Sequence, residues 1–200
     1  LRLNSSIPKH SVPVNADVMK FDFQRLRDSQ LRVGGKLFDV IMMDPPWQLS
    51  TSQPSRGVAI GYSSLADDAI GMLPIPSLQT AGFIFNGSCD LTRVINAKYS
   101  FTCNLMKHWG YKLVDEIVWI KKTINGKIAK GHGFYLQHAK ETCLVGVKVA
   151  AENQNENQIK FNKNVGSDVI FSERRGQSQK PNEIYELIEK MIPKGWFRFK

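Results

Sequence analysis

The chain has 200 residues, of which 42% are hydrophobic and 22% charged, and these proportions are typical of a single soluble globular domain spanning residues 1–200. No apolar run approaches the roughly 20 residues that cross a bilayer, so we expect no membrane partner. The formal net charge of +9 leaves two interpretations open: a polyanionic partner such as nucleic acid, or a solvated basic surface.

The sequence indicates a piece of a longer protein from a reducing compartment. It begins LRLNSSIPKHSVP, without an initiating Met or an apolar signal core. Cys89, Cys103 and Cys143 are odd in number and far apart, which argues against a disulfide framework. His132 and His138 are the only close histidine pair. Neither nearby thiolates nor an H-E-x-x-H spacing accompanies them, so we expect no metal site.

The predicted elements begin with strands. The run FDVIMM, residues 38–43, is continuously apolar, as expected of a parallel strand covered on both faces, and residues 82–87 and 140–148 have the same character. Residues 112–122, KLVDEIVWIKK, predict a further strand, and WFRFK at 196–200 alternates like one. These strands are interspersed with helical patterns.

Two helices are predicted from apolar spacing and breaker residues. The first ends at Gly110, and the second begins at Pro181 and ends at Pro193. Their apolar faces are formed by Phe101, Leu105, Met106 and Trp109 in the first, and by Ile184, Leu187, Ile188 and Met191 in the second. The polar segments Gln48–Ser64 and Ala150–Asn164 predict loops, the second a mobile surface excursion. The alternation predicts a doubly wound α/β sheet, in which ligands bind beyond the carboxyl ends of strands.

The tetrapeptide Asp44, Pro45, Pro46 and Trp47 stands at such a strand end. An exocyclic aromatic amine, as on adenine, is a poor nucleophile because its lone pair is delocalised into the ring. A carboxylate and a neighbouring backbone carbonyl can accept the two amine hydrogens and aim that lone pair at an electrophile. Two prolines stiffen the loop, and a Trp offers a face on which a base can stack. The alternative interpretation is a simple turn with Trp47 in the core.

An ordered set of motifs then gives a family resemblance. After DPPW come GY at 61–62, LPIPSLQTAGFIF, HWGYKLVDEIVWIK, HAKETCLVGVK and DVIFSERRGQSQKPNEIYELIEKMIP. From about Asp17 to the end, the chain resembles the MT-A70 (METTL-type) adenine N6-methyltransferases of eukaryotes. Within that family it looks most similar to the catalytic subunit of the ciliate DNA adenine methyltransferase complex.

The resemblance implies a Rossmann-like class I methyltransferase fold that is circularly permuted, with S-adenosyl-L-methionine as the methyl donor. In this family the loop that binds the cofactor nucleoside follows the last strand. This matches the absence of a G-x-G-x-x-G motif from the chain, and we expect the cofactor ribose-binding residues to lie beyond Lys200.

Individual site residues follow from the same resemblance. Asp17 and Val18 match a segment that binds the adenine end of the cofactor, and Asp44 with Pro45 matches the contact to its methionine end and the target amine. Lys140 matches a lysine that reaches the cofactor and the reaction centre. Tyr62 and Glu116 match residues that line the substrate pocket. Structural roles compete with three of these: Tyr62 could cap a loop, Glu116 could pair with Lys112 or Lys121, and Lys140 could be a solvated charge at a strand edge.

The resemblance also implies partners and a cellular setting. It implies DNA rather than RNA as substrate, a paralogous non-catalytic subunit of the same fold, further DNA-binding subunits, and work in the nucleus. Inactive paralogues have lost the acid-proline-proline-aromatic signature, whereas this chain keeps it, so we expect an active enzyme rather than a scaffold. One departure from the family pattern is NGSCD at 86–90, where the RNA-modifying members have an apolar-aromatic stretch.

Overall fold

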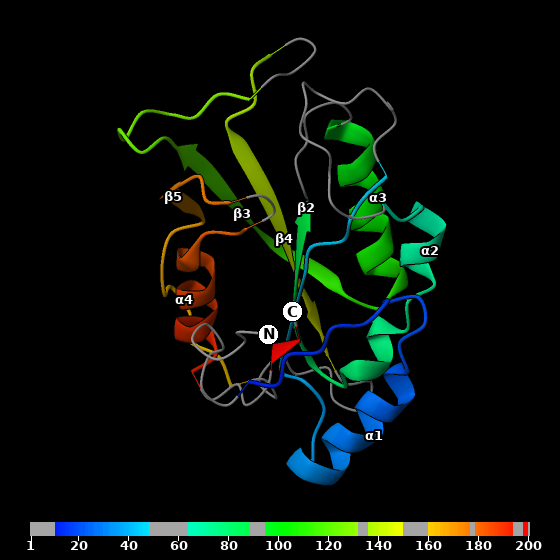
Figure 1. The fold of residues 1–200 in the computed structure, drawn as a ribbon. Coiled ribbons are helices and arrows are strands. Elements are labelled where there is room, and N and C mark those ends of the chain that lie inside the picture. The colour runs from blue at the N-terminus through cyan, green and yellow to red at the C-terminus, as the bar shows by residue number, and fades with distance from the viewer. Residues whose placement is uncertain are drawn as a thin grey trace.

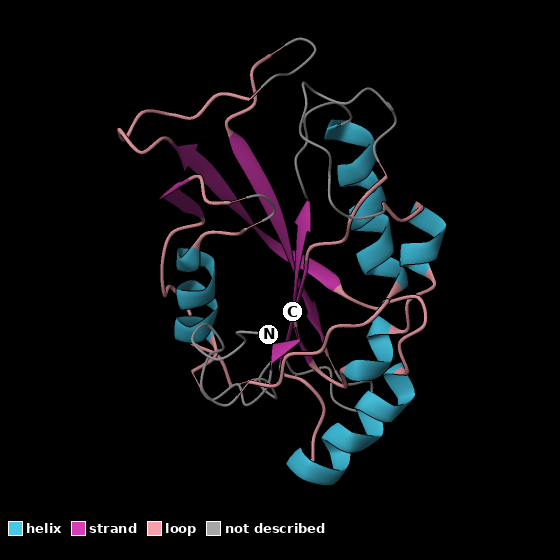
Figure 2. Cartoon of the chain, viewed as in Figure 1, coloured by secondary structure: helices cyan, strands magenta, loops and turns pink. Residues whose placement is uncertain are grey.

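The computed structural model describes residues 11–48, 64–88, 95–131, 136–149, 160–176, 179–193 and 198–199 (Figure 2). Within these residues the chain forms a layered α/β structure. One mixed sheet separates α4 on one face from α1, α2 and α3 on the other (Figure 1). This arrangement confirms the predicted α/β class with helices on both faces of a sheet.

The sheet contains six strands in the order β5-β3-β4-β2-β1-β6. These strands are β1 Val40–Met43, β2 Gly82–Ser88, β3 Lys112–Lys122, β4 Lys140–Lys148, β5 Val169–Glu173 and β6 Arg198–Phe199. Strand β1 pairs in parallel with β2 and β6, and β3 pairs in parallel with β5, whereas β4 runs antiparallel to both of its neighbours. The sheet is therefore mostly parallel with one inserted antiparallel strand. Its circular permutation stays a prediction.

The direction of β4 corrects one expectation. Residues 140–148 form a strand as predicted, but it is antiparallel rather than parallel. Their continuous apolar run reflects burial on both faces: Leu144 packs on the side of α3, and Cys143, Val145 and Val147 pack on the side of α4. Such a run indicates that a strand is buried on both faces, but it does not indicate whether the strand is parallel or antiparallel to its neighbours.

The helices are α1 Phe23–Gly34, α2 Asp67–Gly71, α3 Ile95–His108 and α4 Asn182–Met191, with a short 3₁₀ turn, η1, at Ile75–Leu78. Helix α3 starts earlier than its apolar residues indicated and ends before Gly110, whose φ of 81° is left-handed, as a terminating glycine requires. Pro181 caps α4, and its apolar spacing is confirmed by the burial of Ile184 and Ile188. Helix α1 was not predicted, because only Phe23 and Gln30 of its residues are buried.

Two apolar clusters, one on each face of the sheet, form the core. One gathers around Ile41, Ile84 and Leu144 beneath α1 and α3, and the other gathers around Phe85, Val145 and Ile188 beneath α4. Both clusters draw on β1, β2 and β4, so the central strands are held from both sides. Among the helices that the structure describes, none has the length and apolar character needed to cross a membrane.

Candidate active site

Asp44 directly follows β1, at the edge of the sheet where the parallel strands have their carboxyl ends. Its Oδ2 lies 3.0 Å from the Nζ of Lys180, which stands two residues before α4. The Lys180 side chain is only 11% exposed and the Asp44 side chain 26% exposed. The Asp44 carboxylate is therefore held by the largely buried ammonium group of Lys180, which comes from a distant part of the chain.

Lys180 also binds Glu141, the second residue of β4. Its Nζ donates to Oε2 of Glu141 over 2.9 Å, and Oε1 of the same carboxylate lies 2.6 Å from Nζ of Lys121, near the end of β3. Asp44, Lys180, Glu141 and Lys121 thus form one chain of alternating charges, which we call the site network. Two carboxylates and two ammonium groups leave it with no formal net charge.

The electrostatics of Glu141 show how strongly the site network is coupled. Burial alone raises the pKa of the Glu141 carboxyl, but the ammonium groups of Lys180 and then Lys121 outweigh burial and hold that pKa below its usual value. The neighbouring Cys143 thiol lies on the same side of β4 and is buried, and burial raises its pKa to about 12. Cys143 therefore stays protonated and is a poor nucleophile. The charged groups at this edge are those of the site network.

The loop after Asp44 is fixed by backbone hydrogen bonds. The N–H of Trp47 donates to the carbonyl of Pro45 over 2.9 Å, and the N–H of Leu65 donates to the carbonyl of Pro46 over 2.8 Å. Both of these carbonyls already accept one hydrogen bond inside the protein. Each carbonyl oxygen has two lone pairs, so each keeps capacity for a second donor.

Trp47 is part of the core beneath this loop. Its side chain is 6% exposed, its Nε1 donates to the carbonyl of Gly87 over 3.3 Å, and its ring packs edge-on against Phe101 with centroids 5.9 Å apart. Stacking a base requires an accessible ring face. The structure therefore favours a role for Trp47 in stiffening the loop. Of the two interpretations of this residue, base stacking and a position in the core, the second is the one observed.

Gly87, at the end of β2, leaves room beside the acid. A Cβ on this residue would lie 3.2 Å from Oδ1 of Asp44 and 3.5 Å from the carbonyl of Met43. Its neighbour Asn86 is fully buried opposite Met43. The departure NGSCD thus brings a residue without a side chain next to the carboxylate.

The other predicted site residues are distributed around the molecule. Glu116 pairs in register with Leu144 and accepts a hydrogen bond of 2.9 Å from Tyr99 of α3, so it belongs to the face covered by α3 rather than to the site network. This bond raises the pKa of Tyr99. Lys140 is exposed, and Glu141 beside it is the residue that binds Lys180. Tyr62 lies outside the described residues.

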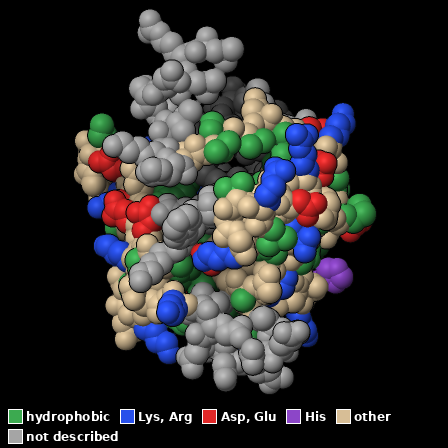
Figure 3. Space-filling model, turned by 90° about the horizontal axis from the view of Figure 1, so that it is seen from below, with side chains coloured by type: hydrophobic (Ala, Val, Ile, Leu, Met, Phe, Trp, Pro, Cys, Tyr) green, Lys and Arg blue, Asp and Glu red, His purple; other side chains and the backbone are tan. Residues whose placement is uncertain are grey.

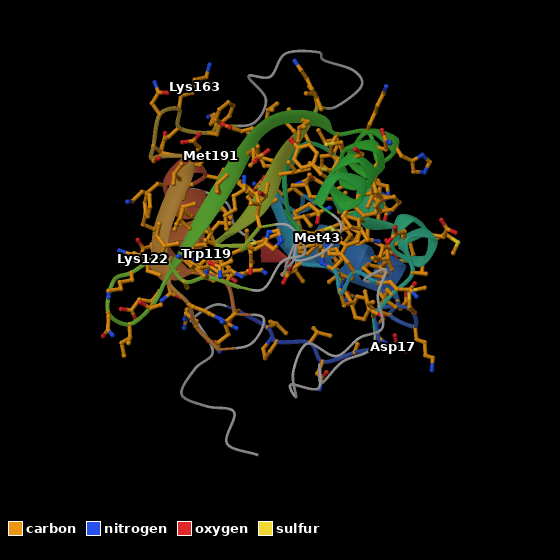
Figure 4. The ribbon with its side chains drawn as sticks, turned by 90° about the horizontal axis from the view of Figure 1, so that it is seen from above. Asp17, Met43, Trp119, Lys122, Lys163 and Met191 are labelled. Carbon is orange, nitrogen blue, oxygen red and sulfur yellow. The ribbon has the colours of Figure 1, made fainter. Side chains whose placement is uncertain are left out.

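Asp17 and Val18 precede α1 on the other side of the sheet edge. Viewed onto that edge, Asp17 lies on the opposite side of Met43 from Trp119 and Lys122 (Figure 4). The Asp17 carboxylate accepts a hydrogen bond from the Met19 N–H, and its segment borders a cavity of about 440 Å³. The cavity is lined by Ala16, Asp17, Lys20, Phe21, Asp22, Arg25, Leu26 and Ser29.

Sequence reasoning missed Glu141, Lys180 and Lys121. A signal existed for Glu141, because a period of two along β4 places it on the same side as Cys143 and Val145 and places Lys140 on the other. Lys180 carried no local signal, since only the tertiary structure brings it to Asp44. In the part of the chain that the structure describes, no three His, Cys, Asp or Glu side chains gather as metal ligands.

Comparisons with known proteins identify the family of this chain. The MT-A70 family matches residues 38–197. The chain belongs to the MT-A70 family. It is 37% identical to the human N(6)-adenosine-methyltransferase catalytic subunit METTL3 over 158 residues, covering 78% of this chain and 24% of that protein. It is 36% identical to an MT-A70-like N(6)-adenosine-methyltransferase of Arabidopsis thaliana over 159 residues, covering 78% of this chain and 20% of the relative.

The chain is also similar to a non-catalytic methyltransferase subunit. The METTL14 subunit of Drosophila melanogaster is 28% identical over 181 residues, covering 82% of this chain and 42% of that protein. The chain spans less than a quarter of the length of the two methyltransferases above. The resemblance to a ciliate subunit in particular stays a prediction.

Proposed function

We propose that this MT-A70 chain is the catalytic domain of an enzyme that transfers a methyl group from S-adenosyl-L-methionine to the exocyclic N6 amine of adenine in nucleic acid. One observation carries the proposal: the Asp44 carboxylate is held 3.0 Å from Lys180 at the carboxyl end of β1. Ligands of doubly wound sheets bind at this edge. Family membership and the similarity to named adenosine methyltransferases support the same reaction.

Asp44 prepares the amine for attack. A carboxylate offers about four acceptor positions, so its pairing with Lys180 leaves capacity for an amine hydrogen. The carbonyl of Pro46 accepts from Leu65 through one lone pair and offers the second to the other amine hydrogen. Two such acceptors draw the nitrogen lone pair out of the ring and direct it at the methyl group. The hydrogen-bonded loop keeps both acceptors in place before the substrate arrives.

The residues at this edge fit the cofactor. Its methionine end carries one ammonium and one carboxylate group, and Asp44 and Lys180 offer one group of each opposite charge. Gly87 leaves the space beside Asp44 unfilled. For the adenine end, we assign the segment of Asp17 and Val18, which borders the cavity before α1. When bound, the cofactor supplies an electrophilic methyl group on a positively charged sulfur.

A nucleic-acid substrate is supported by a cluster of cations beside the site network. Lys122, Lys127, Arg174 and Arg175 form what we call the basic edge. The Arg174 N–H donates to the carbonyl of Lys122, Lys127 accepts a backbone hydrogen bond from the turn after β3, and the Arg175 guanidinium donates to the carbonyl of Lys180.

The basic edge thus joins charges that are dispersed in the sequence. Such groups bind phosphates, position a strand without reading its sequence, and make affinity depend on salt. The face at the other end of the sheet mixes basic with acidic and apolar side chains (Figure 3).

The finer proposal is that the substrate is DNA in the nucleus and that a paralogous non-catalytic subunit, with further DNA-binding subunits, completes the enzyme. It is supported by the ciliate resemblance and by the similarity to a non-catalytic METTL14 subunit. A duplex base must leave the stack before its amine reaches the site, which costs a few kcal/mol that additional protein contacts offset. RNA is the second candidate, because the relatives are named as adenosine methyltransferases and adenosine is the nucleoside of RNA.

The test is methyl transfer from labelled cofactor to matched DNA and RNA oligonucleotides, with and without adenine, by the full-length protein alone and with its paralogous partner. We expect adenine-dependent transfer by the complex, little by the single subunit, and more to DNA than to RNA at equal salt. Transfer that persists without adenine would contradict the reaction. A preference for RNA of the same sequence would overturn only the DNA assignment.

A further inference from the structure

The two carboxylate oxygens of Glu141 bind two different lysines. One oxygen binds Lys180, which in turn binds Asp44, and the other oxygen binds Lys121 over 2.6 Å. All three charged side chains around Asp44 are nearly withdrawn from solvent, with 11% of Lys180, 13% of Glu141 and 16% of Lys121 exposed. Charges withdrawn in this way interact strongly, and their geometry depends on each partner being present.

We propose that Lys121 is a positioning residue of the methyl-transfer site: by binding the far oxygen of Glu141, it leaves Lys180 available to hold Asp44. The inference rests on the proposed function of Asp44. The role differs from that of Lys180, because Lys121 acts through Glu141 rather than on the acid that contacts the substrate.

Charge balance explains why the second lysine is needed. With Lys121 present, two ammonium groups serve two carboxylates. Without it, Glu141 and Asp44 compete for Lys180, and the more buried carboxylate has more to lose from a lost partner. Glu141 is the more buried of the two. Lys180 then turns toward Glu141, and Asp44 loses the contact that fixes its orientation.

The fold places Lys121 for this task. Lys121 lies near the end of β3, where its N–H donates to the carbonyl of Ala139 and its carbonyl accepts from Ala129, so the backbone on both sides is fixed. Its ammonium group also lies 5.5 Å from the ring centroid of Trp119, a buried residue of the same strand. Both contacts hold the side chain over the start of β4, where Glu141 stands.

The experiment compares Lys121→Met with Lys122→Met in the full-length protein with its partner. Lys122 is the matched control, because it is the next residue of β3 and belongs to the basic edge. We expect Lys121→Met to lower kcat on the order of tenfold, as for coupled members of one charge network, with KM for the oligonucleotide unchanged. Lys121→Arg restores most of kcat. Lys122→Met, which removes a charge of the basic edge, raises KM for the oligonucleotide.

A double-mutant cycle identifies the route. If Lys121 acts through Glu141, Lys121→Met in a Glu141→Gln background costs nothing further in kcat. Equal additional loss in that background would overturn the proposal, and so would a wild-type kcat for Lys121→Met. A loss confined to KM, with a lower salt dependence of binding, would show that Lys121 binds phosphate instead.

The failure of this proposal and that of the proposed function give different results. A wild-type complex without adenine methylation would refute the function itself. An active wild type with an unchanged Lys121→Met variant would refute only the positioning role. Thermal unfolding of every variant checks that a loss of kcat comes from folded protein.

Discussion

Two largely buried polar networks lie at opposite ends of the same sheet, and they are built from different chemistry. The site network at the carboxyl ends of the parallel strands consists of four charged side chains bound to one another. At the other end, Gln79 donates to the carbonyls of Phe38 and Phe83 and accepts from the hydroxyl of Tyr111 over 2.8 Å. We call this second set the support network.

The support network is closed by a single lysine bound to backbone. Lys148 donates to the carbonyls of Pro76 and Gln79 over 2.7 and 2.8 Å, and burial lowers the pKa of its ammonium group. Gly82 lies so close to Gln79 that a Cβ would meet the Gln79 amide nitrogen at 2.2 Å. The support network thus ties loop carbonyls to side chains, whereas the site network ties charges to charges.

The difference separates stability from function. Hydrogen bonds to buried carbonyls stabilise a fold because each unpaired carbonyl costs free energy. A buried charge network stabilises little compared with apolar packing of the same volume, so its presence at a ligand-binding edge points to chemistry. Changes in the support network should therefore lower the free energy of unfolding, and changes in the site network should lower the rate.

The largest expected effect is on catalysis, from Asp44→Ala. Loss of a preorganised acceptor typically costs about 10² to 10³ in rate, while only a partly exposed loop side chain is removed. Labelled methyl transfer and thermal unfolding measure the two quantities. Asp39→Ala is the control, because Asp39 stands just before β1 and pairs with Lys36. Retention of more than half the wild-type turnover by Asp44→Ala would refute the assignment.

The next effect is on stability, from Gln79→Leu. The substitution leaves the buried hydroxyl of Tyr111 without its acceptor and the carbonyl of Phe38 without its side-chain donor, and we expect a loss of about 1 to 3 kcal/mol in the free energy of unfolding. Urea denaturation measures this loss, and kcat per folded molecule should not change. A fall in kcat with unchanged stability would reverse the roles of the two networks.

A smaller effect is expected from Tyr111→Phe. It removes one hydroxyl and keeps the ring packed, so the free energy of unfolding should fall by about 0.5 to 1.5 kcal/mol. Tyr99→Phe is a useful counterpart, because it removes the hydroxyl that donates to Glu116 at a partly buried position. A larger loss from Tyr99→Phe than from Tyr111→Phe would mean that the network around Glu116 carries more of the stability.

The smallest effect concerns pH. Because the folded protein lowers the pKa of Glu141, its ionised form contributes stability above the unfolded-state pKa, and this contribution is lost as pH falls through the folded-state pKa. Glu141→Gln should therefore lose less stability on acidification than the wild type. Unfolding followed from neutral pH down through the acid range tests this, with the exposed Glu186→Gln as control. Parallel curves for wild type and Glu141→Gln would contradict the expected linkage.

Five of the six strands that the structure describes, two of the helices and the position of Asp44 could be predicted from the sequence by itself. Continuous apolar runs are a local signal of strands that are buried on both faces. An acid and two prolines directly after such a strand place the acid at the edge of the sheet where the parallel strands end. The same local information left out α1, in which only Phe23 and Gln30 are buried, and the short strand β5, in which only Ile170 is buried.

Only the tertiary structure decided which charges meet. Lys180 and Lys121 are 59 positions apart in the numbering, yet both bind Glu141, and no pattern along the chain records an ion pair between segments so distant. The structure also turned β4 antiparallel and buried Trp47 beneath its loop. Strand direction and side-chain burial depend on which strands and helices pack against a given segment. The pattern of apolar residues along the chain indicates how many faces of a strand are buried, but it does not identify the elements that bury them.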